Sequence, residues 1–260
     1  MRQIFEMLID THSHIYSEEF NDDIDEVITR AYDSDVRKII LPNIDSSSIK
    51  KMLDLADQYP QICFPLMGLH PTSVGEDYQE ELELVEFWLK KRKFYGIGEI
   101  GIDLYWERTF VEQQIIAFRH QLQLAKKYQL PVVLHVRESF DEVFTVVKEE
   151  NTPELTGVFH SFTGTIEQAE KIIDLGFKIG IGGIVTFKNS GLDEVVRMIE
   201  PQHLILETDA PYLTPAPFRG KRNESSYAIH IARKIAEIHK LSINEVAKIT
   251  STNAVNLFGI

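Results

Sequence analysis

Two histidines stand one residue apart near the start of the chain, in the stretch IDTHSHIY at residues 9–16. Side chains alternate between the two faces of a β-strand, so a strand here would point Asp10, His12 and His14 in one direction. Two imidazoles on one face can bind a single metal ion. The alternative is that they are ordinary polar residues at the end of a strand. Residues elsewhere in the chain favour the metal site.

Histidines and acids of the same kind recur where other short apolar runs end. The third, fifth and sixth runs end near a histidine, and the fourth and eighth end near two carboxylates each: these residues are His70, His135, His160, Glu99, Asp103, Glu207 and Asp209. Imidazoles and carboxylates that converge from several strands make a site for one divalent metal ion or for two. A carboxylate such as Glu99, opposite the His12 and His14 pair, could bridge two ions about 3.5–4 Å apart.

The elements that must position these side chains are short apolar runs that alternate with longer amphipathic ones. The runs that predict buried strands are residues 7–14, 38–44, 62–71, 94–103, 131–136, 157–162, 177–185 and 204–211. Apolar residues at i, i+3, i+4 and i+7 predict helices over 22–34, 48–59, 80–91, 112–128, 141–150, 166–176, 192–200, 225–240 and 242–260. Ser242 with Glu245 is a capping-box pattern for the last helix, and Gly176 is typical of the residue that ends one.

Successive strand-then-helix units with strongly apolar strands indicate an α/β protein whose parallel sheet is covered by helices. The number of units and the length of 260 residues favour a single (β/α)₈ barrel of the TIM type over residues 1–260. A doubly wound open sheet is the alternative. In such a barrel the active site lies at the C-terminal ends of the strands, where the histidines and acids fall. Independent polar residues would be scattered instead.

Composition limits the class of protein. Hydrophobic residues at 43% and charged residues at 26% are typical of a soluble globular protein, and Cys63 alone cannot form an internal disulfide or a cysteine metal cluster. No apolar run approaches the roughly 20 residues that span a membrane, and the start MRQIFEM lacks a secretory signal. We therefore expect a cytoplasmic protein. The net charge of −13 argues against a broad basic surface for nucleic acid, but not against a site made positive by metal ions.

A basic segment follows the eighth predicted strand. The stretch APYLTPAPFRGKRNES, residues 210–225, carries Arg219, Lys221 and Arg222 in an otherwise acidic protein. Beside a metal site such a loop would suit an anionic substrate, above all a phosphate. It could equally be a solvated loop whose charges aid solubility. Arg137, just beyond His135, is better placed because the end of its strand would aim it at the site.

Seven motifs in order resemble the TatD family of metal-dependent deoxyribonucleases, which belongs with the amidohydrolase-like barrels. They are DTHSH, GLHP, GEIGID, LHVRES, FHSFTG, ETDAPYL and RGKRNES, and they cover the chain from residue 10 to about residue 226. The last motif of the family usually has proline where this chain has Ser225. The departure affects the shape of that loop and leaves the expected metal ligands in place.

The resemblance implies two divalent ions per subunit, which could be Mg²⁺, Mn²⁺ or Zn²⁺. His12 and His14 would bind one ion and His135 and His160 the other, with Glu99 between them. The resemblance also implies that Asp209 completes the first site and holds the attacking water, so that Asp209 and Glu99 are the catalytic carboxylates. Asp10 and Glu207 would support the ligands from behind. His70 and Asp103 would line the site and contact the substrate or a third ion. The position of Arg137 at a strand end and of Arg222 in the basic segment adds these two as expected substrate contacts.

The activity implied by the resemblance is hydrolysis of DNA phosphodiester bonds, as a 3′-to-5′ exodeoxyribonuclease acting on single strands or 3′ ends. Another bond on the same metal pair, such as an amide, a phosphotriester or a tRNA ester, is the first alternative. A barrel that binds metal without catalysis is the second. No aromatic ladder predicts extended stacking on a single strand; Tyr105 and Trp106 are the candidates nearest the site. Neither a membrane nor an obligate protein partner is expected.

Overall fold

Strands and helices alternate along the chain, as the sequence predicts. The computed structural model describes residues 6–106 and 108–260, and within them eight strands each lead into a helix. The strands are β1 (Leu8–Asp10), β2 (Val36–Leu41), β3 (Cys63–Pro65), β4 (Ile97–Asp103), β5 (Val132–Arg137), β6 (Gly157–Phe159), β7 (Lys178–Ile181) and β8 (Leu204–Leu206). The helices are α1 (Ile24–Asp33), α2 (Ser46–Gln58), α3 (Tyr78–Lys91), α4 (Val111–Tyr128), α5 (Phe140–Glu150), α6 (Ile166–Asp174), α7 (Leu192–Met198), α8 (Ala228–His239) and α9 (Ile243–Phe258).

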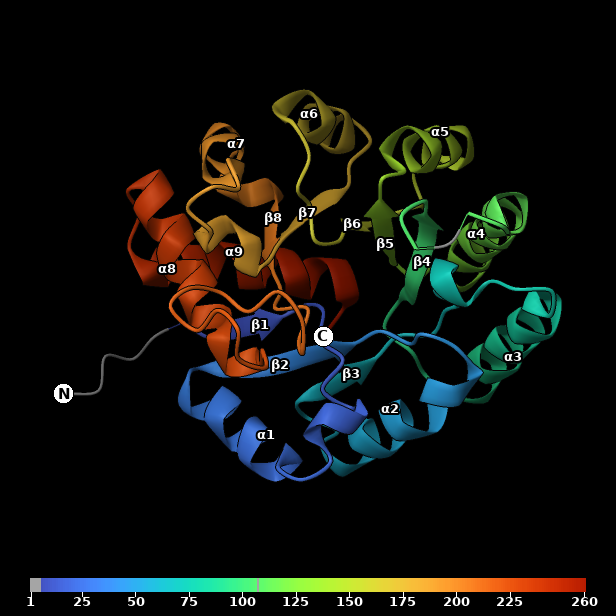
Figure 1. The fold of residues 1–260 in the computed structure, drawn as a ribbon, viewed down its shortest axis with the longest axis horizontal. Coiled ribbons are helices and arrows are strands. Elements are labelled where there is room, and N and C mark those ends of the chain that lie inside the picture. The colour runs from blue at the N-terminus through green and yellow to red at the C-terminus, as the bar shows by residue number, and fades with distance from the viewer. Residues whose placement is uncertain (1–5, 107) are drawn as a thin grey trace.

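The strands close into a barrel with the helices outside, which confirms the predicted (β/α)₈ fold (Figure 1). Strands β1 to β3 pair in order, and so do β4 to β8, all of them parallel. Two single-residue parallel bridges join these groups: Met67 with Ile97, and Ser13 with Ala210. The second bridge brings the segments that follow β1 and β8 together, and both segments carry expected site residues.

Several strands end earlier than the apolar runs predict. Strand β1 ends at Asp10, so His12 and His14 lie in the segment beyond it rather than on the pleated strand. The backbone there leaves the ladder for individual hydrogen bonds: Ser13 N donates to Ile40 O, and His14 N donates to Ala210 O. The expectation that the histidines share a strand face is therefore wrong in detail, although both still enter the barrel mouth.

An apolar plug fills the interior of the barrel. Side chains from six strands or their ends meet two side chains of α9; they are Ile9, Ile40, Phe64, Leu66, Val133, Val158, Ile205, Ala254 and Phe258. A second, larger cluster packs the outer strand faces against the surrounding helices. The burial of both strand faces explains why the strands are apolar throughout.

Helix ends follow the capping chemistry of the sequence. Ser242 Oγ accepts from Glu245 N, and Glu245 Oε2 accepts from Ser242 N, which confirms the predicted capping box of α9. Helix α6 ends at Asp174, and Gly176 then takes a φ of +83°, the left-handed conformation that glycine adopts without strain. The capping box fixes where α9 begins, and Gly176 turns the chain from α6 toward β7.

Within the described ranges, no helix has the length and apolar character needed to cross a lipid bilayer. The segment MRQIFEM, in which we expect no secretory signal, includes residues 1–5, which lie outside the described residues.

Replacing Ser242 by alanine should destabilise the protein by about 1 kcal/mol, because the amide of Glu245 loses its acceptor and the Glu245 carboxylate loses the hydroxyl that donates to it. The midpoint of urea unfolding measures this change. Ser242→Thr keeps the hydroxyl and should unfold close to the wild-type midpoint. Equal midpoints for the alanine and wild-type proteins would show that the capping box contributes nothing.

Candidate metal centre

Glu99 lies at the centre of a buried polar cluster in the mouth of the barrel. It is on β4, and its two carboxylate oxygens face different imidazoles. Oε2 lies 3.1 Å from His12 Nε2 and 3.6 Å from His14 Nε2. Oε1 lies 2.7 Å from His135 Nδ1 and 3.5 Å from His70 Nε2. The carboxylate therefore separates two sets of nitrogen donors, as a ligand that bridges two ions would.

Asp209 faces the same cluster from the segment after β8. Its Oδ1 lies 3.8 Å from His12 Nε2, 3.9 Å from His14 Nε2 and 3.8 Å from His160 Nε2. Its φ of +57° is left-handed, a conformation that aspartate tolerates better than most residues. The amide of Tyr212 donates to its carbonyl and its own amide donates to His12 O. Burial raises the pKa of Asp209 to about 6.

Three groups of side chains bring metal-binding atoms within 4.8 Å of one another. The groups are His12, His14 and Asp209; His12, Glu99 and His160; and His70, Glu99 and His135. All six expected ligands are thus together in the structure. The grouping differs from the expected one, because His160 joins His12 while His70 joins His135. His70, expected at the substrate, stands among the candidate ligands.

The donor set fits divalent metal ions. Nitrogen and carboxylate oxygen are the donors that Zn²⁺ and Mn²⁺ take together, and His12 Nε2 and His14 Nε2 approach each other to 3.1 Å. Burial would lower the pKa of His160, but the carboxylates around it, chiefly Glu207, raise that pKa to about 10. Burial would raise the pKa of Glu99, but the surrounding imidazoles, chiefly His12, hold it well below its usual value. The cluster thus favours bound positive charge, whether protons or metal ions.

Glu207 supports His160 from within the barrel wall. Glu207 Oε1 lies 3.0 Å from His160 Nδ1 and accepts a hydrogen bond from Ser161 N. This leaves the other imidazole nitrogen, Nε2, to face the cluster. Gly180 on β7 makes room for the carboxylate, since a Cβ there would lie 2.8 Å from Glu207 Cδ. The sequence predicted Glu207 as a support; a glycine inside a strand is the signal that could have added Gly180.

Asp10 ties the ends of β1 and β8 together. Its Oδ1 accepts from Thr208 N at 2.8 Å and its Oδ2 accepts from Thr208 Oγ1 at 2.6 Å. Burial raises the pKa of Asp10 to about 7. Ser225 is buried beside it, and Ser225 Oγ lies 3.2 Å from Ser13 Oγ. The residue that departs from the family pattern therefore forms a hydrogen bond to the segment that carries His12.

Asp103 orients His135. Its Oδ2 lies 2.9 Å from His135 Nε2, and Glu99 Oε1 lies 2.7 Å from the other ring nitrogen, Nδ1. Burial would lower the pKa of His135, but the hydrogen bonds to Asp103 and Glu99 raise it to about 9. Asp103 Oδ1 accepts from the amides of Tyr105 and Trp106. An aspartate expected to touch the substrate thus connects a candidate ligand to the loop after β4.

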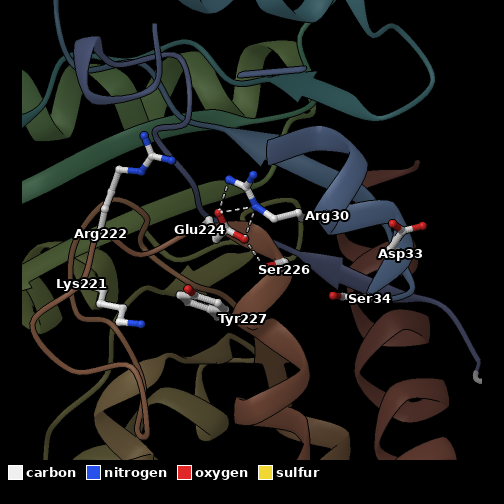
Figure 2. A pocket seen from close by; sticks show the side chains of 8 residues that line it. All are labelled: Arg30, Asp33, Ser34, Lys221, Arg222, Glu224, Ser226 and Tyr227. Atoms are coloured by element: carbon white, nitrogen blue, oxygen red, sulfur yellow. Dashed lines mark hydrogen bonds and ion pairs between the residues drawn. The ribbon is translucent and has the colours of Figure 1, made fainter. Parts of the chain in front are cut away.

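Arg222 and Lys221 of the basic segment line a pocket away from the metal centre. Figure 2 shows Arg222 and Lys221 lining a pocket with Arg30 of α1. Arg222 donates to both carboxylate oxygens of Asp23, at 2.8 and 2.7 Å, and these hydrogen bonds lower the pKa of Asp23 to about 2. Arg30 pairs with Glu224 at 2.6 Å. Within residues 6–106 and 108–260, Arg222 thus has its contacts with α1 and the turn before it, and none of them is with a candidate ligand.

This protein is a parallel barrel with imidazoles and carboxylates gathered at one end, an arrangement typical of metal-dependent hydrolases. The family model described as TatD related DNase matches residues 9–259. A Bacillus subtilis protein named uncharacterized metal-dependent hydrolase YabD is 38% identical over 255 residues, which cover 98% of this chain and 100% of that one. The crystal structure of YjjV, a TatD homologue from Escherichia coli, has a TM-score of 0.91 at 33% identity, covering 97% of this chain and 98% of that one. The chain belongs to the TatD related DNase family.

Gly180→Ala should weaken metal binding about 10- to 100-fold, because the new Cβ displaces the carboxylate that orients His160. Titration of metal-stripped protein with Mn²⁺ or Zn²⁺ in a calorimeter measures the affinity. Gly182→Ala is the matched control: its Cβ would meet Glu207 O at 3.7 Å, an ordinary contact. Unchanged affinity in Gly180→Ala, with the fold intact, would contradict the role given to Glu207.

Proposed function

We propose that this protein hydrolyses DNA phosphodiester bonds from 3′ ends, as a 3′-to-5′ exodeoxyribonuclease that uses two divalent ions. The observation that carries the proposal is the position of Glu99, whose oxygens face separate sets of imidazoles at 3.1 and 2.7 Å. A shared carboxylate of this kind is what a two-ion phosphodiester site requires. The description of the matching family as a DNase supports the choice of bond.

The residues divide into two sets of ligands around Glu99. His12, His14 and Asp209 would hold one ion, and His135 with His70 or His160 would hold the other. Divalent ions held in this way supply positive charge that offsets the phosphate and makes a water molecule more acidic. The protein holds the imidazoles in place through Asp103 and Glu207, so that only one nitrogen of each supported ring is directed at the centre.

Asp209 is the carboxylate placed to act on the attacking water. Its side chain is 15% exposed, whereas that of Glu99 is 4% exposed. A water molecule can therefore reach Asp209, which would orient it and accept its proton as the water attacks phosphorus. Arg137, exposed at the end of β5, would hold the nonbridging oxygens of the phosphate.

The depth of the centre supports action at strand ends. His12 is fully buried and the other candidate ligands are buried or nearly so. A frayed strand end can extend into such a mouth more readily than a continuous duplex can.

Asp209→Asn should lower the rate of nucleotide release about 10²- to 10⁴-fold while most metal binding remains, because the amide keeps the shape of the carboxylate but cannot accept the proton. Single-stranded DNA labelled at the 3′ end in one sample and at the 5′ end in another is incubated with metal-stripped protein, and Mg²⁺, Mn²⁺ or Zn²⁺ is added in turn. We expect release of the 3′ label first and a shortening ladder from the 5′-labelled strand.

Asp54→Asn, on the exposed surface of α2, is the matched control and should cleave at the wild-type rate. Intact DNA under every metal, with metal bound to the protein, would contradict the proposal. The same samples would then be assayed with amide, phosphotriester and aminoacyl-ester substrates. Internal cuts without loss of the 3′ label would replace exonuclease by endonuclease action.

A further inference from the structure

Two adjacent aromatic side chains are exposed directly after β4. Trp106 is 67% exposed and Tyr105 is 49% exposed. Their rings meet edge to face, with centroids 4.7 Å apart and planes at 89°. A tryptophan with most of its surface in water forgoes the gain of burial, so it contributes little to the stability of the core. The two rings are in contact with each other, and aromatic rings exposed beside a candidate site are the groups on which single-stranded nucleic acids stack their bases.

Arg137 completes the group. Its guanidinium carbon lies 4.5 Å from the centroid of the Tyr105 ring and 5.5 Å from that of Trp106. In the described part of the chain, no carboxylate lies within ion-pair distance of this guanidinium. We call Tyr105, Trp106 and Arg137 the aromatic platform.

A second arginine–aromatic stack shows what such a pair looks like when it serves structure alone. Arg37 lies 4.0 Å over the ring of Tyr32. There the guanidinium pairs with Asp35 at 2.8 Å and donates to Tyr32 O at 2.6 Å. Arg37 is near the start of β2, so this stack is at the end of the barrel opposite the metal centre. Among the described residues, the guanidinium of the aromatic platform has no such ion pair.

The aromatic platform is attached to the metal centre by one carboxylate. Asp103 Oδ1 accepts from Tyr105 N at 2.9 Å and from Trp106 N at 2.6 Å. The other oxygen of Asp103 lies 2.9 Å from His135 Nε2. Arg137 is two residues beyond His135 on β5, so both side chains leave the strand on the same face. A ligand stacked on these rings would therefore adjoin the centre.

We propose that the aromatic platform stacks the unpaired base of a nucleotide adjoining the scissile phosphate, while Arg137 meets a backbone phosphate of the same strand. The inference rests on the proposed function and deepens it by naming what is recognised: a single-stranded nucleic-acid end with its base present. Stacking accepts every base because each has a π-face, so recognition is tolerant of sequence. A paired end must first give up its stacking in the duplex.

The decisive test measures two forms of the protein on two forms of the substrate. Cleavage is measured for wild-type and Trp106→Ala proteins on a single-stranded oligonucleotide and on the same strand with abasic sugars at the two 3′-terminal positions. We expect the abasic substrate to raise KM about tenfold for the wild-type protein. Trp106→Ala should raise KM about tenfold on the normal strand and cause little further loss on the abasic one. Tyr32→Ala should behave as wild type.

Additive losses, or a Trp106→Ala protein with wild-type KM on the normal strand, would overturn the aromatic platform even if DNA is cleaved. A binding measurement without cleavage tests it separately. The chain has two tryptophans, so Trp88→Phe leaves Trp106 as the only one. Without metal, a short thymidine oligomer should quench its fluorescence, and the abasic oligomer should not. Quenching in a protein that cuts no DNA would uphold the aromatic platform and overturn the exonuclease; cleavage without quenching would do the reverse.

Discussion

A carboxylate buried among imidazoles governs the rest of this structure. Removing an ionised glutamate from water costs several kcal/mol, so Glu99 can remain charged only while its neighbours supply compensating charge. His135, whose pKa is raised to about 9, can do so 2.7 Å from one oxygen, while the His12 ring lies 3.1 Å from the other. Strand β4 must therefore hold Glu99 on the barrel axis, and the ends of β1 and β5 must reach it. The barrel must therefore close for the side chains of the centre to meet.

Around this centre the histidines are fixed by further carboxylates. Asp103 holds His135, Glu207 holds His160, and Asp10 joins the two chain segments that carry His12 and Asp209. These acids account for part of the formal charge of −13 and make the mouth attractive to cations rather than to DNA. Under the proposed function, a phosphate would depend on divalent ions and on Arg137 to approach. An acidic protein can act on an anionic polymer in this way without a broad basic surface.

Much of the fold and of the ligand set could be predicted from sequence because both follow periodic rules. Apolar runs predict the strands, and the rule that barrel sites lie at strand carboxyl ends selects His12, Glu99 and Asp209. The pairing of ligands could not be predicted, since it depends on where each strand leaves the ladder: β1 stops at Asp10, before both histidines. Nor could the fate of Arg222, whose partner Asp23 is far away in sequence. A side-chain contact between residues far apart in sequence leaves no pattern in the sequence around either residue.

The apolar plug beneath the metal centre closes the inner end of the barrel mouth. Phe64, Val133 and Phe258 fill the barrel below the ligands, so a chain that enters from above has no exit at the other end. Under the proposed exonuclease activity, a released nucleotide would leave through the mouth by which the strand entered. Entry of the next strand end and departure of the product would then have to alternate through one opening.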